Sequence, residues 1–396
     1  MHNNKTKYYI SQVLYNSAYL LTTGSVIQAF MTECKISESF ISFYVAILQL
    51  VQVFIMLLVS GRIERTKNII KSTSLTHMFQ AVLPTALIIL CFFKGGNVFI
   101  AYGVILLLGV AANIAQGINN IIAYKLPYHI IDIKDYGKVV SIGGIFISIF
   151  GAAISFILSV SSNYGSYFSV MSLFFLFATA SLILSGAIVK SYKDEFSAPG
   201  KSETKKINML LYKPFYTLAI PNLLRGISTG IISVAFVIGS YLNILDANTA
   251  GVLALISQVA SLLGYFLYKA ISKGNHDGAI LLFSSISMAV LFPFLIINKT
   301  EVVFYIIYFL LNIVLILINV GVPVAVTKIV HYDYIGQYSA WRMLLHTLGC
   351  AIGSGITVFL LSAFGGNVTL IFAGSCQLIS GISYYLFLRN SKNKLI

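Results

Sequence analysis

One arginine, Arg225, lies in the middle of a long apolar run that extends over residues 215–240. A charged side chain at membrane depth costs about 3 kcal/mol on insertion scales, so it usually has a partner or a function. All twelve acidic residues of the chain lie between the apolar runs or at their ends, and none lies inside a run. A guanidinium without a carboxylate partner can bind an anionic group, and we expect Arg225 to do so. The alternative is a structural arginine that contacts helix carbonyls or a tyrosine hydroxyl.

Two further basic side chains, Arg342 and His346, are four residues apart in a later apolar run. Residues at this spacing share one face of a helix. Together they could form an anion entry, or Arg342 could be an anchor that extends to the membrane surface and His346 a packing histidine. His346 can titrate near neutral pH, and with Glu33 it is a candidate carrier of a coupling proton.

Uncharged polar side chains also occur within several apolar runs. Asn113, Gln116 and Asn120 follow the i, i+3, i+7 spacing of one helix face. Such amides can bind a polar solute or can join helices by hydrogen bonds, and for the cluster we favour a solute-binding cavity. The residues expected to bind substrate are Arg225, Asn222, Asn16, Tyr19, Asn113, Gln116, Asn120, Asn312, Asn319 and His346.

The elements that must position these side chains are membrane-spanning helices. The 396 residues are 58% hydrophobic and 10% charged, against about 25% charged in globular proteins. About twelve runs approach the 20 residues that cross a bilayer as a helix, and backbone groups in hydrocarbon must be paired within their own segment. We expect an all-α integral membrane protein with spans at residues 8–31, 38–60, 72–93, 98–124, 138–161, 166–190, 215–240, 249–271, 278–297, 302–328, 340–363 and 367–388.

The basic residues predict the orientation of these spans. With the N-terminus inside, the outer loops receive only Lys35, Lys94 and Lys299. Cytoplasmic loops are enriched in Lys and Arg, so we expect both termini in the cytoplasm and a location in the cell membrane. This bias also explains the net charge of +14 without a nucleic-acid partner. The first run has no cleavage pattern after it and is interpreted as a span and not as a removed signal.

The chain divides at its one long polar stretch, and its two halves repeat. Residues 191–213 are rich in Lys, Ser and mixed charge, as in a linker, which predicts six-helix bundles at 1–190 and 214–396. The sequence NSAYLLTTG at 16–24 matches NLLRGISTG at 222–230 at Asn, Thr and Gly, and Tyr19 then corresponds to Arg225. A parallel duplication of a six-helix half explains the match.

On these features the chain resembles the major facilitator superfamily of transporters. That family carries a Gly-x-Leu-Ala-Asp-Arg-x-Gly-Arg-Lys motif between its second and third spans, and the stretch Ser60–Asn68 is similar to it, with Glu64 for the Asp and Arg65 for the Arg. The resemblance implies alternating access, with spans 1, 4, 7 and 10 around a central cavity. It also implies a set of gating charges, for which we expect Glu64, Arg65, Asp132, Asp135 and Arg342.

The sequence therefore favours a secondary active or facilitative transporter of a small polar, anionic organic solute. One alternative is an exporter of amphipathic drugs or lipids. Alternatives of another class are a non-transporting sensor or scaffold and a membrane-embedded acyltransferase. We expect no enzyme, because an HExxH motif and paired carboxylates at depth are missing from the sequence, and no metal or cofactor, because the four cysteines have no metal-binding spacing. The expected partners are the lipid bilayer and a small-molecule substrate, with a coupling proton left open, for a monomeric protein.

Overall fold

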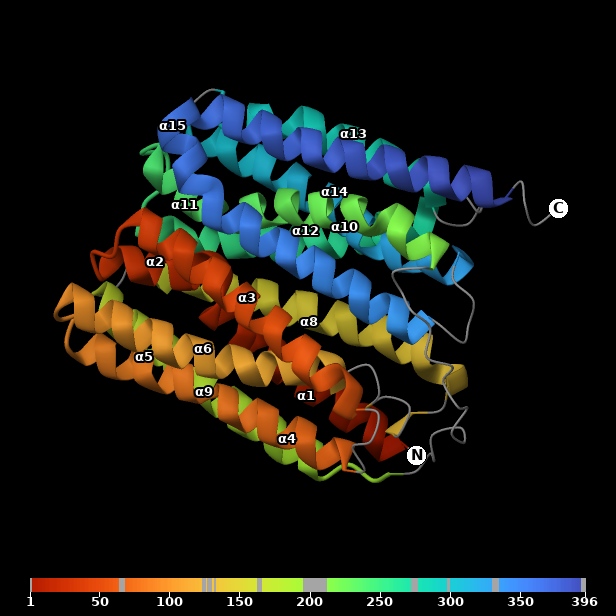
Figure 1. Ribbon diagram of the computed structural model, residues 1–396. Coiled ribbons are helices and arrows are strands. Elements are labelled where there is room, and N and C mark those ends of the chain that lie inside the picture. The colour runs from red at the N-terminus through yellow and green to blue at the C-terminus, as the bar shows by residue number, and fades with distance from the viewer. Residues whose placement is uncertain are drawn as a thin grey trace. The chain divides into compact units, whose positions relative to one another are not determined.

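The computed structural model describes residues 2–63, 68–122, 126, 130–131, 133–161, 166–194, 212–271, 277–297, 300–329 and 335–392. Within these residues every regular element is a helix (Figure 1). The chain forms two compact units: residues 1–202 with 246–258, and residues 203–245 with 259–396. The predicted boundaries at residues 190 and 214 stay predictions, and the predicted all-α membrane fold is confirmed.

The described residues of the first unit contain eight complete α-helices, which correspond to the first six expected spans. Two of those spans are each divided into two helices. The helices are α1 (His2–Thr22), α2 (Gly24–Glu33), α3 (Glu38–Ile63), α4 (Ile69–Gln80), α5 (Val82–Phe92), α6 (Val98–Ile122), α8 (Ile133–Ser161) and α9 (Tyr167–Lys190). The short 3-10 helix η2 (Ala247–Thr249) and the start of α12 (Ala250–Ile271) also belong to this unit.

The second unit contains the remaining spans. Its helices are α10 (Lys213–Ser233), α11 (Ala235–Tyr241), the rest of α12, α13 (Asp277–Phe294), α14 (Glu301–Ile329) and α15 (Ile335–Lys392). The 58 residues of α15 comprise two expected spans, and the break lies at Gly365, where φ is 80° and ψ is 166°. Only glycine adopts this conformation at low cost. Figure 1 shows that α15 turns back on itself.

Nine helices in the described part of the chain are long and apolar enough to cross a membrane, or ten if α10 and α11 are one bent span. Two features account for the difference between ten and the twelve expected spans. The α15 segment is counted once although it contains two spans. The α1 helix begins with the polar stretch HNNKTK, so it is not among the apolar helices although most of the first expected span lies in it.

The first and seventh spans, which the repeat relates, are both interrupted in their C-terminal halves. α1 ends at Thr22, and α2 starts at Gly24, whose φ of +57° favours glycine. α10 and α11 meet at Val234 with a bend of 52°. The two spans therefore share a break as well as sequence, which fits the duplication inferred from the sequence.

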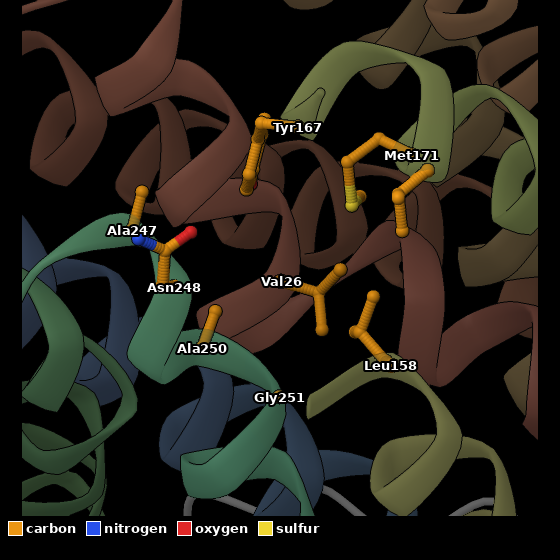
Figure 2. A pocket seen from close by; sticks show the side chains of 9 residues that line it. Val26, Leu158, Tyr167, Met171, Ala247, Asn248, Ala250 and Gly251 are labelled. Atoms are coloured by element: carbon orange, nitrogen blue, oxygen red, sulfur yellow. The ribbon is translucent and has the colours of Figure 1, made fainter. Parts of the chain in front are cut away.

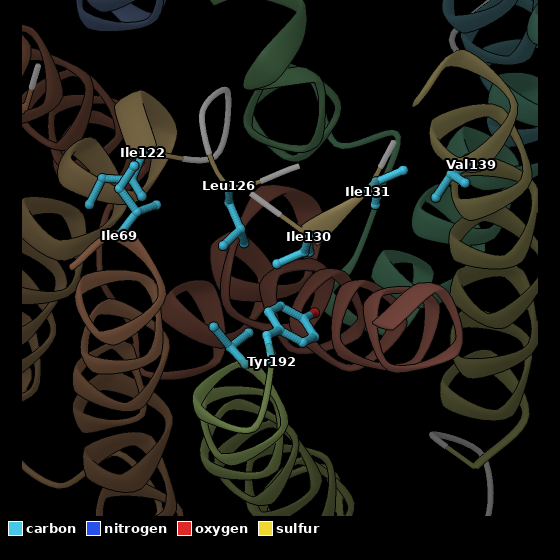
Figure 3. Packing of buried hydrophobic residues seen from close by; sticks show 8 residues of the cluster. Ile69, Ile122, Leu126, Ile130, Ile131, Val139 and Tyr192 are labelled. Carbon is cyan, nitrogen blue, oxygen red and sulfur yellow. The ribbon is translucent and has the colours of Figure 1, made fainter. Parts of the chain in front are cut away.

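A hydrophobic cluster closes the first unit at the end where α1 begins and α9 stops. Figure 3 shows Tyr192 packed in this cluster, whose buried members are Ile69, Ile122, Leu126, Ile130, Ile131, Val139, Val189 and Tyr192. The Tyr192 hydroxyl bonds to Ser11 over 2.5 Å, and Asn4 Nδ2 donates to the Lys193 carbonyl over 2.9 Å. The first residues of the chain are thus bound to the segment that follows the sixth span, as expected when an even number of crossings separates them.

Candidate anion-binding site

The candidate site is built on a close contact between α10 and the first half of α15, which lie side by side in the second unit (Figure 1). A methyl group added at Gly226 would lie 2.1 Å from the His346 carbonyl oxygen, and one at Gly230 would lie 2.2 Å from that of Cys350. From the other side, added methyl groups at Gly349 and Gly353 would lie 2.2 Å from carbonyl oxygens of α10. Two small-xxx-small motifs, Gly226–Gly230 and Gly349–Gly353, therefore let the backbones touch.

This backbone contact brings Arg225 next to the basic face of α15. Arg225 is 3% exposed and Arg342 is 6% exposed. Gly226, the residue after Arg225, packs against the backbone of His346. The sequence predicted that Arg342 and His346 share a face, and the structure adds Arg225 from the neighbouring helix.

The three basic groups carry buried nitrogen atoms without a partner. Arg225 Nε, Arg342 Nε and His346 Nδ1 have no hydrogen-bond partner among the described residues. A buried donor without a partner costs about 1–3 kcal/mol, and more when it is charged. A bound anion could supply the acceptor that these three nitrogen atoms lack among the described residues.

Polar neighbours surround these cations from both halves of α15. The Tyr384 hydroxyl donates to Asn222 Oδ1 over 2.7 Å, while Asn222 Nδ2 donates to the Leu218 carbonyl within α10. His346 Nε2 lies 3.8 Å from Cys350 Sγ. Asn222 thus joins α10 to the buried Tyr384 in the second half of α15, and its contact with a solute stays a prediction.

Aromatic packing fixes the start of both helices near Arg342. The ring of Phe215 contacts Tyr338 with a centroid distance of 6.3 Å and Trp341 with one of 5.9 Å, both edge to face. Such pairs add about 0.5–1.5 kcal/mol beyond burial of their area. Trp341, the residue before Arg342, is therefore packed against α10.

The expected α14 amides differ in their environments. Asn312 is buried, and its Nδ2 donates to the Tyr308 carbonyl over 2.8 Å, whereas Asn319 is exposed. Their proposed contact with a solute stays a prediction.

The expected amides of the first unit form a hydrogen-bonded network of their own. The Tyr15 hydroxyl donates to Gln80 Oε1 over 3.1 Å and also to Gln116 Oε1, and Gln116 Nε2 donates to Asn120 Oδ1 over 3.2 Å. His77 stacks on Tyr15 at a ring distance of 4.2 Å. The network joins α1, α4 and α6, and solute binding by Gln116 and Asn120 stays a prediction.

The other expected residues of the first unit contact their own or a neighbouring helix. Gln52 Nε2 donates to Asn113 Oδ1 over 2.6 Å and so joins α3 to α6. Asn16 Nδ2 donates to the Gln12 carbonyl within α1, and Tyr19 is 40% exposed. None of these contacts excludes a solute, and solute binding by Asn113, Asn16 and Tyr19 stays a prediction.

The expected gating charges are mostly beyond the described residues. Glu64, Arg65 and Asp132 lie outside them, and Asp135 lies on α8 with a side chain that the structure does not describe. Arg342 is described and is buried one helical turn before His346 on α15. Its gating role stays a prediction.

A small pocket in the first unit offers little for a polar solute. Figure 2 shows Tyr167 and Met171 of α9 across from the short segment around Asn248. Its lining carries no charged residue and consists of Val26, Leu158, Tyr167, Val170, Met171, Ala247, Asn248, Ala250 and Gly251. The buried cations of the second unit are therefore the stronger candidate site.

Comparison with solved structures identifies the architecture. The E. coli xylose transporter XylE, described as a proton:xylose symporter of the major facilitator superfamily, matches with a TM-score of 0.66 and 12% identity over 98% of this chain and 95% of that one. This chain has the major facilitator superfamily (MFS) fold. The nucleoside transporter NupG matches with a TM-score of 0.69 and 13% identity over 97% and 99% of the two chains. The human organic anion transporter MFSD10 matches with a TM-score of 0.65 and 8% identity over 97% and 99%.

The similarity is one of fold and not of sequence. No protein-family model and no curated protein matches the sequence. The MFS architecture expected from the spans and the repeat is therefore confirmed, and the chain is a multi-pass membrane protein. Identities of 8–13% carry no information on the solute, so the site residues of this chain must supply it.

Sequence reasoning missed several residues of the site. Gly226, Gly230, Gly349 and Gly353 carry a usable signal, because their two i, i+4 glycine pairs are visible in GISTG and GCAIG. The sequence gives no such signal for Tyr384, because this residue reaches Asn222 only after α15 turns back at Gly365.

Proposed function

We propose that this MFS-fold protein is a secondary transporter that carries a small anionic organic solute through the cell membrane by alternating access. The observation that carries the proposal is the pair of buried arginines, Arg225 and Arg342, whose Nε atoms have no partner among the described residues. Unpaired buried charges destabilise a protein and persist where function requires them. The MFS-fold proteins of known structure named above transport sugars, nucleosides or organic anions.

The proposed anion site contains Arg225, Arg342 and His346. Arg225 and Arg342 supply the charge, and His346 Nδ1 can supply a further hydrogen bond. Tyr384 and Asn222 hold the wall of the site beside Arg225. The solute would leave water for a buried site, and the two guanidinium groups would replace the hydrogen bonds that the solute loses.

We further propose that both termini lie in the cytoplasm. The excess of Lys and Arg in the loops on that side supports this orientation. The bonds between Asn4 and Lys193 support a common side for the first residues and the start of the predicted linker, and the loop charges assign that side to the cytoplasm.

The experiment is a thermal-shift screen of purified protein against sugars, amino acids, amphipathic drugs and organic anions. Parent protein is compared with Arg225→Gln and with Arg389→Gln, which removes the same charge from an exposed position on α15. An anion at about 100 times its Kd should stabilise the parent and the Arg389 control by about 2.7 kcal/mol, or about 5–10 °C in Tm. The Arg225 variant should show no shift.

The Tm without ligand separates a binding role from a structural one. Removal of an unpaired buried charge should leave the Tm of Arg225→Gln equal to the parent value or higher. If Arg225 were a paired structural residue, the same change would cost about 3–5 kcal/mol and lower Tm. Stabilisation by neutral or amphipathic compounds in all three proteins, with no response to anions, would refute the proposal in favour of an exporter of amphipathic molecules.

Transport itself is tested in liposomes that contain the purified protein. The anion found in the screen, in radiolabelled form, should enter liposomes with the parent or the Arg389 control and should not enter liposomes with Arg225→Gln. Binding without uptake by the parent would indicate a sensor.

A further inference from the structure

The backbones of Arg225 on α10 and Arg342 on α15 lie at different levels along the contact between these two helices. His346 lies opposite Gly226, because its carbonyl oxygen is the atom nearest to a methyl group added there. Arg225 is the neighbour of Gly226, so its backbone is level with His346. Arg342 precedes His346 by one turn, which is about 6 Å along the helix axis. The site therefore contains two arginines whose backbone positions are about one helical turn apart.

Both cations are deeply buried, and neither is neutralised by an acid within the helices that carry it. The α10 helix and the first half of α15 contain no Asp or Glu, since they read KPFYTLAIPNLLRGISTGIIS and IGQYSAWRMLLHTLGCAIGSGITVFLLSAFG. A bound monoanion would compensate one guanidinium charge and leave the second without an acidic counter-charge on these helices. A ligand with two negative charges would compensate both.

We infer that the site selects dianions and that Arg342 is the residue that sets this preference. The inference rests on the proposed function, and it deepens it by naming the charge of the solute. A dicarboxylate of succinate size can place one carboxylate near each arginine. A phosphate monoester can place its doubly charged group between the two flexible side chains. Both classes share the property of carrying two negative charges at neutral pH.

The roles of the two arginines then differ. Arg225 is held beside the glycine contact and the Tyr384–Asn222 pair, so it binds the first anionic group of any ligand. Arg342 lies one turn away and contributes only when a second charge is present. Arg342 is therefore a specificity-determining residue, and Arg225 is required for binding of either type of ligand.

The test uses probe pairs that differ in charge and little in shape. Succinate is compared with its monoamide succinamate, and methyl phosphate with dimethyl phosphate, at about pH 8, where phosphate monoesters carry two charges. Ionic strength is held constant, because screening alone alters surface charge interactions. Half-maximal thermal stabilisation is measured for the parent, Arg342→Gln, Arg225→Gln and Arg389→Gln.

In the parent and in Arg389→Gln, the concentration for half-maximal stabilisation should be lower for the dianion than for its monoanion. In at least one probe pair the difference should be about tenfold or more. Arg342→Gln should bring this ratio close to one while the monoanion still binds. Arg225→Gln should abolish the response to both members of the pair.

Equal potency of the two members in the parent overturns the inference, and so does an unchanged ratio in Arg342→Gln. The inference also fails if none of the four probes acts on a protein that another anion of the screen stabilises. If no anion of any kind stabilises the protein, the proposed function fails as well. The two failures are therefore distinguishable.

Discussion

The contact between α10 and α15 predicts a large effect of a very small substitution. In Gly226→Ala, the added methyl carbon would lie 2.1 Å from the His346 carbonyl oxygen and 2.8 Å from Gly349 Cα. Both are backbone atoms of a helix, so no side-chain rotation can relieve the overlap. Ordinary van der Waals contact begins at 3.4 Å, so the two helices must separate locally by about 1.3 Å.

The size of the effect follows from the packing that this separation disturbs. Overpacking of a close contact costs about 1–3 kcal/mol, and a contact between backbones belongs at the upper end of that range. For a unit of this size, about 3 kcal/mol corresponds to a decrease in Tm of about 6–12 °C. The same separation moves Arg225 away from His346, so anion-induced stabilisation should weaken together with Tm.

The assay is thermal unfolding of purified protein with and without the stabilising anion. The control is Gly103→Ala on α6, because Gly103 is also inside a helix and a methyl group there would meet nothing within 4 Å. Alanine at such a position should leave Tm unchanged or raise it, since alanine favours helix by up to about 1 kcal/mol. A Tm for Gly226→Ala equal to that of the control would refute the glycine contact and the placement of Arg225 beside α15.

Three further outcomes are expected. Tyr384→Phe removes the donor to Asn222 and should lower stability by about 1 kcal/mol, measured as a decrease in Tm; an unchanged Tm would mean that this hydrogen bond contributes nothing. A double-mutant cycle of Gln52→Leu and Asn113→Leu should give a coupling energy of about 0.6–1.7 kcal/mol, whereas additive effects would contradict the contact between α3 and α6. Gly365→Ala forces alanine into a backbone conformation nearly exclusive to glycine and should cost about 1–3 kcal/mol; a gain in Tm would contradict the turn within α15.

Local properties of the sequence were sufficient to predict the fold, because each span is defined by its own residues. Apolar length and loop charge are visible without any knowledge of contacts, and the expected spans coincide with the helices. The i, i+4 spacing also predicted that Arg342 and His346 share a helix face. The position of Arg225 beside them depends on which helices pack together, and no local pattern of Arg225 itself encodes that.

The amides of the first unit show a second limit of sequence reasoning. Gln116 and Asn120 share a face, as their spacing predicted, but spacing alone could not show that the Tyr15 hydroxyl donates to Gln116 or that Tyr15 also bonds to Gln80. A polar side chain in a membrane span can serve a solute or another helix, and the choice depends on partners from distant parts of the chain. Partners for the buried Nε atoms of the two arginines are absent among the described residues, whereas those of the amides are present.

The glycine contact has a consequence for changing the solute that this protein accepts. Because α10 and α15 touch through backbone atoms, the helices on which residues 225, 342 and 346 stand form a fixed platform whose geometry does not depend on those side chains. Replacement of the three side chains should therefore alter the charge and shape of the site without repacking the helices. An engineered site for neutral or cationic solutes would retain the four glycines and vary only residues 225, 342 and 346.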